Sequence, residues 1–113
     1  MKFYNREIKL KNLKEIVKRD FNTFADKFLE KYFKEKLQLT KKYSQIGSYW
    51  ERGNKNEIDI VAVDELNKKL LIAEAKLNKE KINLKLLEQK TKNLLPKFKV
   101  YKVEFKAFGL EDM

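Results

Sequence analysis

The sequence contains no cysteine and no histidine. Their absence excludes disulfide bonds, thiolate or imidazole metal ligands, and any catalytic site in which a histidine acts as acid or base. Chemistry in this chain must therefore use carboxylates, lysines, tyrosines or a metal ion held by oxygen ligands. Glycine and proline are also scarce, with three residues and one residue, so helices and strands are expected to outweigh loops.

Long hydrophobic runs are absent as well. No apolar stretch approaches the roughly 20 residues that a membrane-spanning helix needs, and the first residues are charged rather than signal-like. We therefore expect a cytoplasmic protein without a membrane partner. A chain of 113 residues, 42% of them hydrophobic, can form one packed core, so residues 1–113 are expected to form a single domain.

Positive charge is plentiful. The net charge of +10 would attract a polyanion such as DNA or RNA. The basic residues are almost all lysines, however, and only Arg6, Arg19 and Arg52 are arginines. A lysine-rich surface can also be ordinary solvated surface, so charge alone leaves nucleic-acid binding as one of two interpretations.

Hydrophobic periodicity predicts three helices. The first is expected over residues 6–18, and the third over residues 79–94, between a cap at Asn78 and the helix-breaking Pro96. The second follows a cap at Asp20 and is the clearest, because eight apolar residues recur at helical spacing. They are Phe21, Phe24, Ala25, Phe28, Leu29, Tyr32, Phe33 and Leu37.

Strand patterns fill the rest of the chain. They are expected over residues 44–52, 57–63, 70–76 and 98–108, with a turn at residues 53–56. The order α-α-β-β-β-α-β predicts an α/β domain, more narrowly an α+β fold with a mixed sheet, because the third helix gives the last strand a crossover connection.

Four charged residues interrupt the second and third strands. Pairing these strands as a symmetric hairpin places Asp59 opposite Glu74 and Glu57 opposite Lys76, with all four side chains on one face. Opposed carboxylates repel, and a bound Mg²⁺ or Mn²⁺ would remove that repulsion. Lys76 would then lie where an ammonium can orient an attacking water or stabilise a phosphate. The alternative is a salt-bridged strand end, in which Lys76 simply neutralises the two glutamates.

The segment Glu57-Ile58-Asp59, followed about fifteen residues later by Glu74-Ala75-Lys76, resembles the signature of PD-(D/E)XK nucleases. Together with residues 46–50 and 57–62 it is more closely similar to an uncharacterised nuclease-like domain at the C-terminus of certain archaeal and bacterial AAA-type ATPases. The likeness covers roughly residues 24–108. It implies a restriction-endonuclease-like α-β-β-β-α-β core, about residues 21–108, with an extra N-terminal helix, and metal-dependent hydrolysis of phosphodiester bonds in DNA.

The resemblance also implies site residues. A glutamate on the preceding helix often completes such a site, and Glu30 matches its position, with Glu35 as a rival. The implied metal ligands are Asp59, Glu74 and Glu30, the implied cofactor is Mg²⁺ or Mn²⁺, and Lys76 completes the catalytic group.

Nucleic-acid contacts are expected on the third helix and at the first turn. Lys90 falls within the apolar stripe of that helix, where it must either extend to solvent or meet a polar partner, and Gln89 is its neighbouring alternative. Lys55 and Arg52 are the candidates at the turn. Trp50 could stack on bases if it is exposed, but a core position under a helix is the commoner outcome.

Departures from the family pattern leave alternatives open. Ile58 stands where the eponymous proline would be, and the sequence has no phosphate-binding loop, so this chain cannot itself be the ATPase. An ATPase would then be a partner of this chain, and the resemblance also implies a homodimer as an alternative, because small nucleases of this type often pair. The same domain could also be a non-catalytic module that binds nucleic acid, DNA or RNA, or such a partner.

Overall fold

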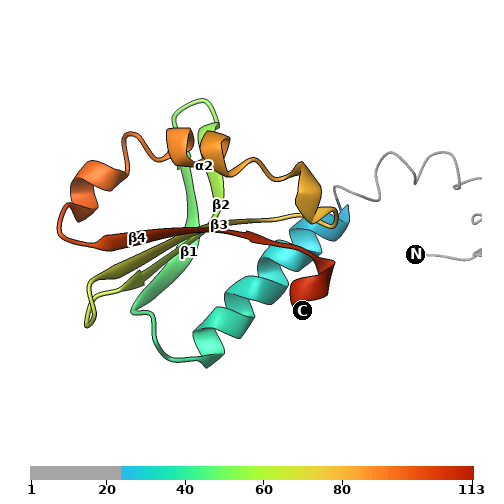
Figure 1. Ribbon diagram of the computed structural model, residues 1–113, viewed down its shortest axis with the longest axis horizontal. Helices are drawn as coiled ribbons and strands as arrows, with labels where there is room; N and C mark the ends of the chain where they lie inside the picture. The colour runs from blue at the N-terminus through green and yellow to red at the C-terminus, as the bar shows by residue number, and fades with distance from the viewer. Residues whose placement is uncertain (1–23) are drawn as a thin grey trace, which may run out of the picture.

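The computed structural model describes residues 24–113, in which a helix over residues 24–39 precedes a four-stranded sheet (Figure 1). The predicted order α-β-β-β-α-β is confirmed, and the fold is α+β. The helix expected over residues 6–18 and the cap at Asp20 lie outside the described residues. The elements after the first helix are β1 (Gln45–Glu51), β2 (Lys55–Asp64), β3 (Lys69–Ala75), η1 (Lys79–Lys81), α2 (Leu84–Lys90), η2 (Leu95–Phe98), β4 (Lys102–Phe108) and η3 (Leu110–Asp112).

The sheet is mixed, as predicted, with the strand order β1-β2-β3-β4. β1 pairs with β2 and β2 pairs with β3 in antiparallel fashion, whereas β3 and β4 run parallel. Parallel neighbours need a crossover connection, and the segment containing α2 provides it.

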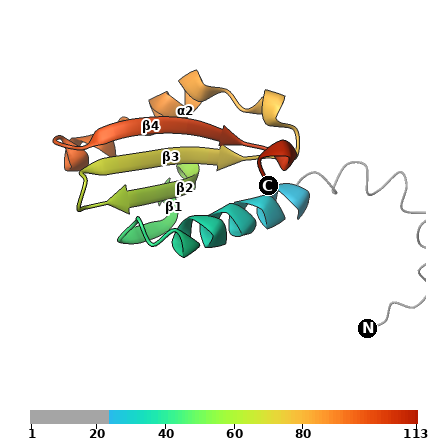
Figure 2. The same ribbon diagram turned by 60° about the horizontal axis from the view of Figure 1, so that its bottom comes forward.

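The helix over residues 24–39 covers one face of the sheet, and α2 with its flanking turns lies over the other (Figure 2). Each face has its own apolar cluster. Leu29 and Phe33 of the first helix pack with Ile60 of β2 on one side. Leu87 of α2 packs with Ile72 of β3 on the other. The sheet is therefore buried on both faces, which is why β2 and β3 are rich in isoleucine, valine, leucine and alanine.

The apolar stripe predicted for the helix that follows Asp20, observed here over residues 24–39, was too wide. Phe24 and Phe28 are 72% and 56% exposed, while Leu29 and Phe33 are buried. A helix packed on one sheet buries a stripe little more than about 100° wide, and the predicted set extends beyond it. Two phenylalanines are consequently left at the surface.

The prediction of one long third helix was wrong. Asn78 caps only the 3₁₀ turn η1, and Asn83 begins α2, where its side-chain oxygen accepts hydrogen bonds from the backbone N–H groups of Lys85 and Leu86. The second asparagine starts a new helix because its side chain binds the N–H groups of that helix's first turn.

The last strand also begins later than predicted. It starts at Lys102 rather than at residue 98, because residues 95–98, with Pro96 in the first turn, form the 3₁₀ turn η2. Proline is favoured in the first turn of a helix and disfavoured inside a sheet, so the alternating pattern before Lys102 did not form a strand.

Candidate functional site

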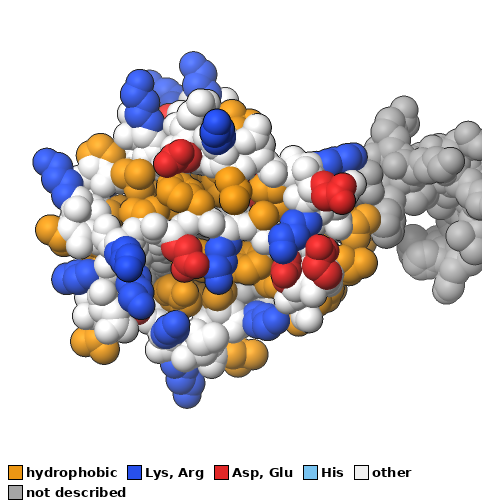
Figure 3. All heavy atoms as spheres, in the orientation of Figure 1, with side chains coloured by type: hydrophobic (Ala, Val, Ile, Leu, Met, Phe, Trp, Pro, Cys, Tyr) orange, Lys and Arg blue, Asp and Glu red, His pale blue; other side chains and the backbone are white. Residues whose placement is uncertain are grey.

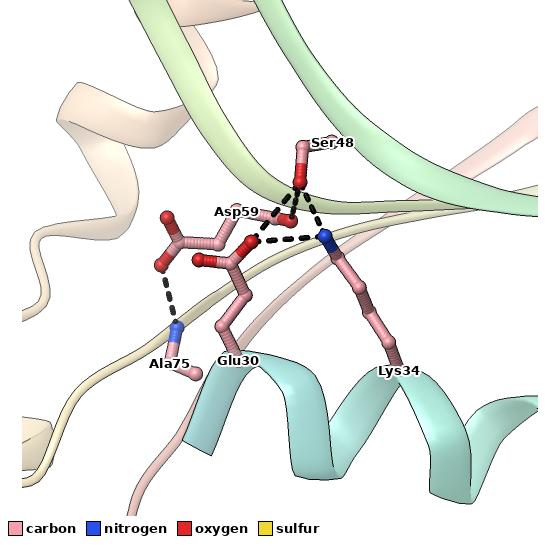
Figure 4. Close-up of polar contacts among 5 residues, drawn as sticks. All are labelled: Glu30, Lys34, Ser48, Asp59 and Ala75. Atoms are coloured by element: carbon pink, nitrogen blue, oxygen red, sulfur yellow. Dashed lines mark hydrogen bonds and ion pairs between the residues drawn. The ribbon is translucent and has the colours of Figure 1, made fainter. Parts of the chain in front are cut away.

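Asp59 lies where β2 and β3 stop pairing. The two strands keep the predicted register as far as Ile60 opposite Ala73. One residue further on, Oδ2 of Asp59 accepts a hydrogen bond of 3.0 Å from the backbone N–H of Ala75 (Figure 4). The carboxylate thus takes the place of a backbone acceptor at the end of the ladder, which fixes its position between the strands.

The predicted pairs of Asp59 with Glu74 and of Glu57 with Lys76 are not formed, and the four side chains do not share one face. Glu74 forms an ion pair with Lys90 of α2. The other three line pockets that also include residues of the first helix, on the opposite face. The pairing of β1 with β2 shifts register across this stretch of β2, so strict alternation of faces does not hold there.

Glu30 reaches the same site from the first helix. Its Oε2 atom accepts a hydrogen bond of 2.9 Å from Nζ of Lys34, one turn further along. The Ser48 hydroxyl on β1 lies 3.1 Å from Oε2 and 2.9 Å from the backbone oxygen of Asp59, and it accepts a hydrogen bond from Lys34. A hydroxyl has a single proton, so Ser48 donates to either partner and links Glu30 to the strand that carries Asp59 (Figure 4).

Glu30 and Asp59 form the shared wall of two adjoining pockets. One has a volume of about 170 Å³ and extends from these carboxylates to Lys76 and Asp26. The other has a volume of about 200 Å³ and extends from them to Trp50. Three of the four predicted catalytic residues therefore meet in one place, whereas Glu74 is absent from both walls.

Asp26 is a site residue that the sequence analysis missed. It lines the pocket with Lys76, and its Oδ1 atom accepts a hydrogen bond of 2.6 Å from the backbone N–H of Leu77. Its spacing of four residues from Glu30 places both carboxylates on one side of the helix, and this was the available signal. Ser48 and Lys34 were missed for a different reason, since their role depends on the tertiary contact.

The pKa of Asp59 is raised to about 6, chiefly because the carboxyl group is buried. The negative charges of Glu74 and Glu30 raise it further, while the hydrogen bond from Ala75 and the charge of Lys90 act in the opposite direction. The net effect disfavours the ionised form. Burial is thus the main reason for the shift, and the neighbouring carboxylates add to it.

Glu74, the third predicted ligand, is paired with a lysine from α2. It is 8% exposed, and its Oε2 atom lies 2.9 Å from Nζ of Lys90. Of the two outcomes considered for Lys90, the polar partner is the one observed. Gln89 is exposed beside it on α2, and Lys55 and Arg52 are exposed at the turn between β1 and β2. The four predicted nucleic-acid contacts thus form two separate pairs.

The remaining candidates, Glu35 and the aromatic residues of β1, differ in how far they are exposed. Glu35 is exposed and lines neither pocket next to Asp59. Tyr49 packs on the apolar cluster beneath α2, and its hydroxyl donates a hydrogen bond of 2.6 Å to Glu51, which helps to raise its pKa to about 12. Trp50 is 62% exposed, so the expectation that it packs in the core was wrong.

The donor set matches a small divalent cation in part. Among residues 24–113 no three acidic side chains are grouped as ready-made metal ligands. Glu30 and Asp59 line the same wall, however, and Mg²⁺ is commonly held by one or two carboxylates, with water and phosphate oxygens in its other positions. Burial raises the pKa of Asp59 most, and the charges of Glu74 and Glu30 raise it further; a bound cation would relieve this second, repulsive contribution.

Within the described part of the chain, no helix has both the length and the apolar character needed to cross a membrane. No curated protein and no solved structure matches the chain. A family model matches residues 1–102, which is most of the sequence. The chain therefore belongs to the DUF234 family, archaeal and bacterial proteins of unknown function.

Proposed function

We propose that this protein is a metal-dependent nuclease of the PD-(D/E)XK type, which hydrolyses phosphodiester bonds in DNA. The observation that carries the proposal is the position of Asp59. Its carboxylate is fixed between two strands, has a pKa raised to about 6, and shares a pocket with Glu30 and Lys76. Strongly perturbed carboxylates in clefts are typical of functional sites.

Each residue has a role in this proposal. Asp59 and Glu30 would hold Mg²⁺ or Mn²⁺, which when bound supplies a Lewis acid for the phosphate and lowers the pKa of water. Lys76 lines the same pocket and stabilises negative charge that develops on the phosphate oxygens. Lys34 and Ser48 hold the carboxylate of Glu30 in place.

Glu74 has a conditional role. Its carboxylate lines neither pocket and pairs with Lys90 on the side of the sheet that α2 covers. It would therefore join the donor set, and leave Lys90 free for the phosphate backbone, only after that ion pair opened and the end of β3 rearranged.

The same ion pair favours a second candidate function. If Glu74 stays bound to Lys90, the domain acts as a nuclease-like module that binds nucleic acid or a partner ATPase without hydrolysis. Among residues 24–113 no three acidic side chains are grouped closely enough to hold a metal ion, although Asp26, Glu30 and Asp59 line one pocket, and this supports the alternative. The two candidates differ in whether a divalent cation binds the folded protein.

The test is a cleavage assay on plasmid and single-stranded DNA with Mg²⁺ or Mn²⁺. We expect cleavage by the wild type and a loss of at least roughly 100-fold in Asp59→Ala and Lys76→Ala, as for other residues that stabilise a transition state. Glu65→Ala and Lys68→Ala, exposed in the turn between β2 and β3, are the matched controls and should cleave normally. Full cleavage by both site variants would overturn the mechanism.

A thermal-shift titration with Mn²⁺ separates the two candidate functions. A ligand that binds only the folded state raises its stability, so the wild type should gain melting temperature and Asp59→Ala should not. No shift in the wild type, together with DNA binding but no cleavage, would favour the module.

A further inference from the structure

Trp50 is exposed on β1, although an aromatic side chain of this size would be expected to pack in the core. It is 62% exposed, although its neighbour Tyr49 packs on the apolar cluster beneath α2. Large aromatic side chains are usually well buried, and an exposed one next to a cleft often marks a binding surface. Its indole ring therefore needs an explanation outside the core.

The ring lies directly beside the candidate site. Trp50 lines the pocket of about 200 Å³ whose wall includes Glu30 and Asp59. Ser48, two residues earlier on β1, lines this pocket too and contacts Glu30. Ser48 therefore supplies a polar group to this cleft, and Trp50 supplies an aromatic surface.

Cationic side chains accompany this aromatic surface. Lys27 lines both of the adjoining pockets, and the pocket with Trp50 also contains the carboxylates of Glu30, Glu57 and Asp59. The exposed Arg52 and Lys55 follow within five residues of Trp50 along the chain. An aromatic ring with cations around it is the arrangement that proteins use for single-stranded nucleic acid, because bases stack on the ring while phosphates contact the cations. An apolar segment of a protein partner offers no phosphates for these cations to contact.

We propose that Trp50 stacks on an unpaired base of the nucleic-acid substrate, so that the site accepts single strands or locally unpaired ends rather than intact duplex. This inference deepens the proposed nuclease function and rests on it for the identity of the substrate. In a duplex each base is already stacked between its neighbours, and exposing one to Trp50 requires unpairing. A single strand presents its bases without that requirement.

Trp50 is the sole tryptophan of the chain, so its fluorescence reports directly on this ring. The full chain is titrated with unlabelled single-stranded oligothymidine and with a duplex of equal length, both in EDTA to prevent metal-dependent cleavage. We expect the single strand to quench the tryptophan emission and the duplex to quench it much less. Anisotropy of a labelled strand measures affinity independently.

Substitutions distinguish stacking from mere apolar contact. Trp50→Ala and Trp50→Leu should weaken single-strand binding by roughly 5- to 150-fold, the range expected for one stacked base. Trp50→Phe, which keeps a ring, should recover most of the affinity. Leu66→Ala is the control, because Leu66 is 90% exposed in the turn between β2 and β3, and it should bind as the wild type does.

Four outcomes would overturn the inference. They are an affinity that is unchanged in Trp50→Ala, a strand that binds without quenching, the absence of any strand binding, and an emission that responds only to protein concentration. The last would identify a contact between copies of the chain. Quenching without cleavage would instead retain the stacking contact and reject the nuclease, so the two proposals fail separately.

Discussion

At the scale of single residues, Asp59 combines a functional position with an energetic disadvantage. Its carboxyl group is partly buried and lies near two other carboxylates, and both features raise its pKa. A fold does not retain such a group for stability, since an ionised carboxylate in these surroundings weakens the folded state. Groups of this kind are expected where binding or catalysis requires them.

The pH dependence of stability follows from this shift. The pKa of Asp59 is about 6 in the folded state against the ordinary value of 3.8. Between these values the folded state holds the extra proton, so its contribution to the free energy of unfolding falls as pH rises and stays low above about pH 6. The contribution lost over this window is on the order of 2–3 kcal/mol.

Asp59→Asn should therefore stabilise the protein at pH 8 while abolishing cleavage. The amide oxygen can still accept the hydrogen bond from Ala75, and the buried charge is removed. Urea unfolding at pH 4.5 and pH 8 measures the effect, and the gain over the wild type should be larger at pH 8. A variant that is less stable than the wild type at pH 8 would contradict this account.

Asp64→Asn is the matched control, because its pKa shift has the opposite sign. Hydrogen bonds from Asn67 hold the pKa of Asp64 below its ordinary value. This carboxylate contributes stability above pH 3.8, and that stability is lost as pH falls through the lowered pKa. The substitution should thus reduce stability at pH 8 rather than increase it.

At the scale of elements, the ion pair between Lys90 and Glu74 joins α2 to β3. Lys90→Ala should destabilise the fold by about 1–3 kcal/mol, because it leaves the carboxylate of Glu74 buried without its partner. The double variant Glu74→Gln with Lys90→Met should recover most of that loss. Chemical unfolding of Glu74→Gln, Lys90→Met and the double variant gives the coupling energy.

The control for this cycle is Lys85→Ala on the exposed surface of α2, which should change stability by less than about 0.5 kcal/mol. If Lys90→Ala behaves like this control, the ion pair does not connect the two elements energetically. Glu74 would then be free to join a metal site without any loss of stability.

Sequence patterns predicted the elements well where one physical cause acts alone. The register of β2 with β3 was correct up to Ile60 because alternating side chains and a short connection determine it. Helix ends were predicted poorly where two signals compete, as at Asn78 and Asn83. The same limit applies to the site, since the local irregularity that separates Asp59 from Glu74 arises from the pairing with β1, which no pattern within β2 reveals.

At the scale of the whole molecule, positive charge is widely distributed. Figure 3 shows Lys and Arg side chains spread over the visible face, with acidic side chains between them. The net charge of +10 thus supplies a general attraction for a polyanion. Contacts between lysines and phosphates carry no sequence information, so any preference for particular bases must come from the site itself.

This division of roles predicts how binding responds to salt. The affinity for an oligothymidine strand should fall with salt, with a logarithmic slope of about 0.7 for each phosphate contact. Lys27→Ala and Lys55→Ala should each lower the slope by about 0.7 if they contact phosphates, whereas Trp50→Ala should lower the affinity and leave the slope unchanged.

Lys102→Ala is the control, because Lys102 pairs with Lys69 at the opposite end of β3 from the site. A slope near zero in the wild type would show that the charge has no part in binding, and an equal loss of slope in Lys102→Ala would place the contacts over the whole surface rather than around Trp50.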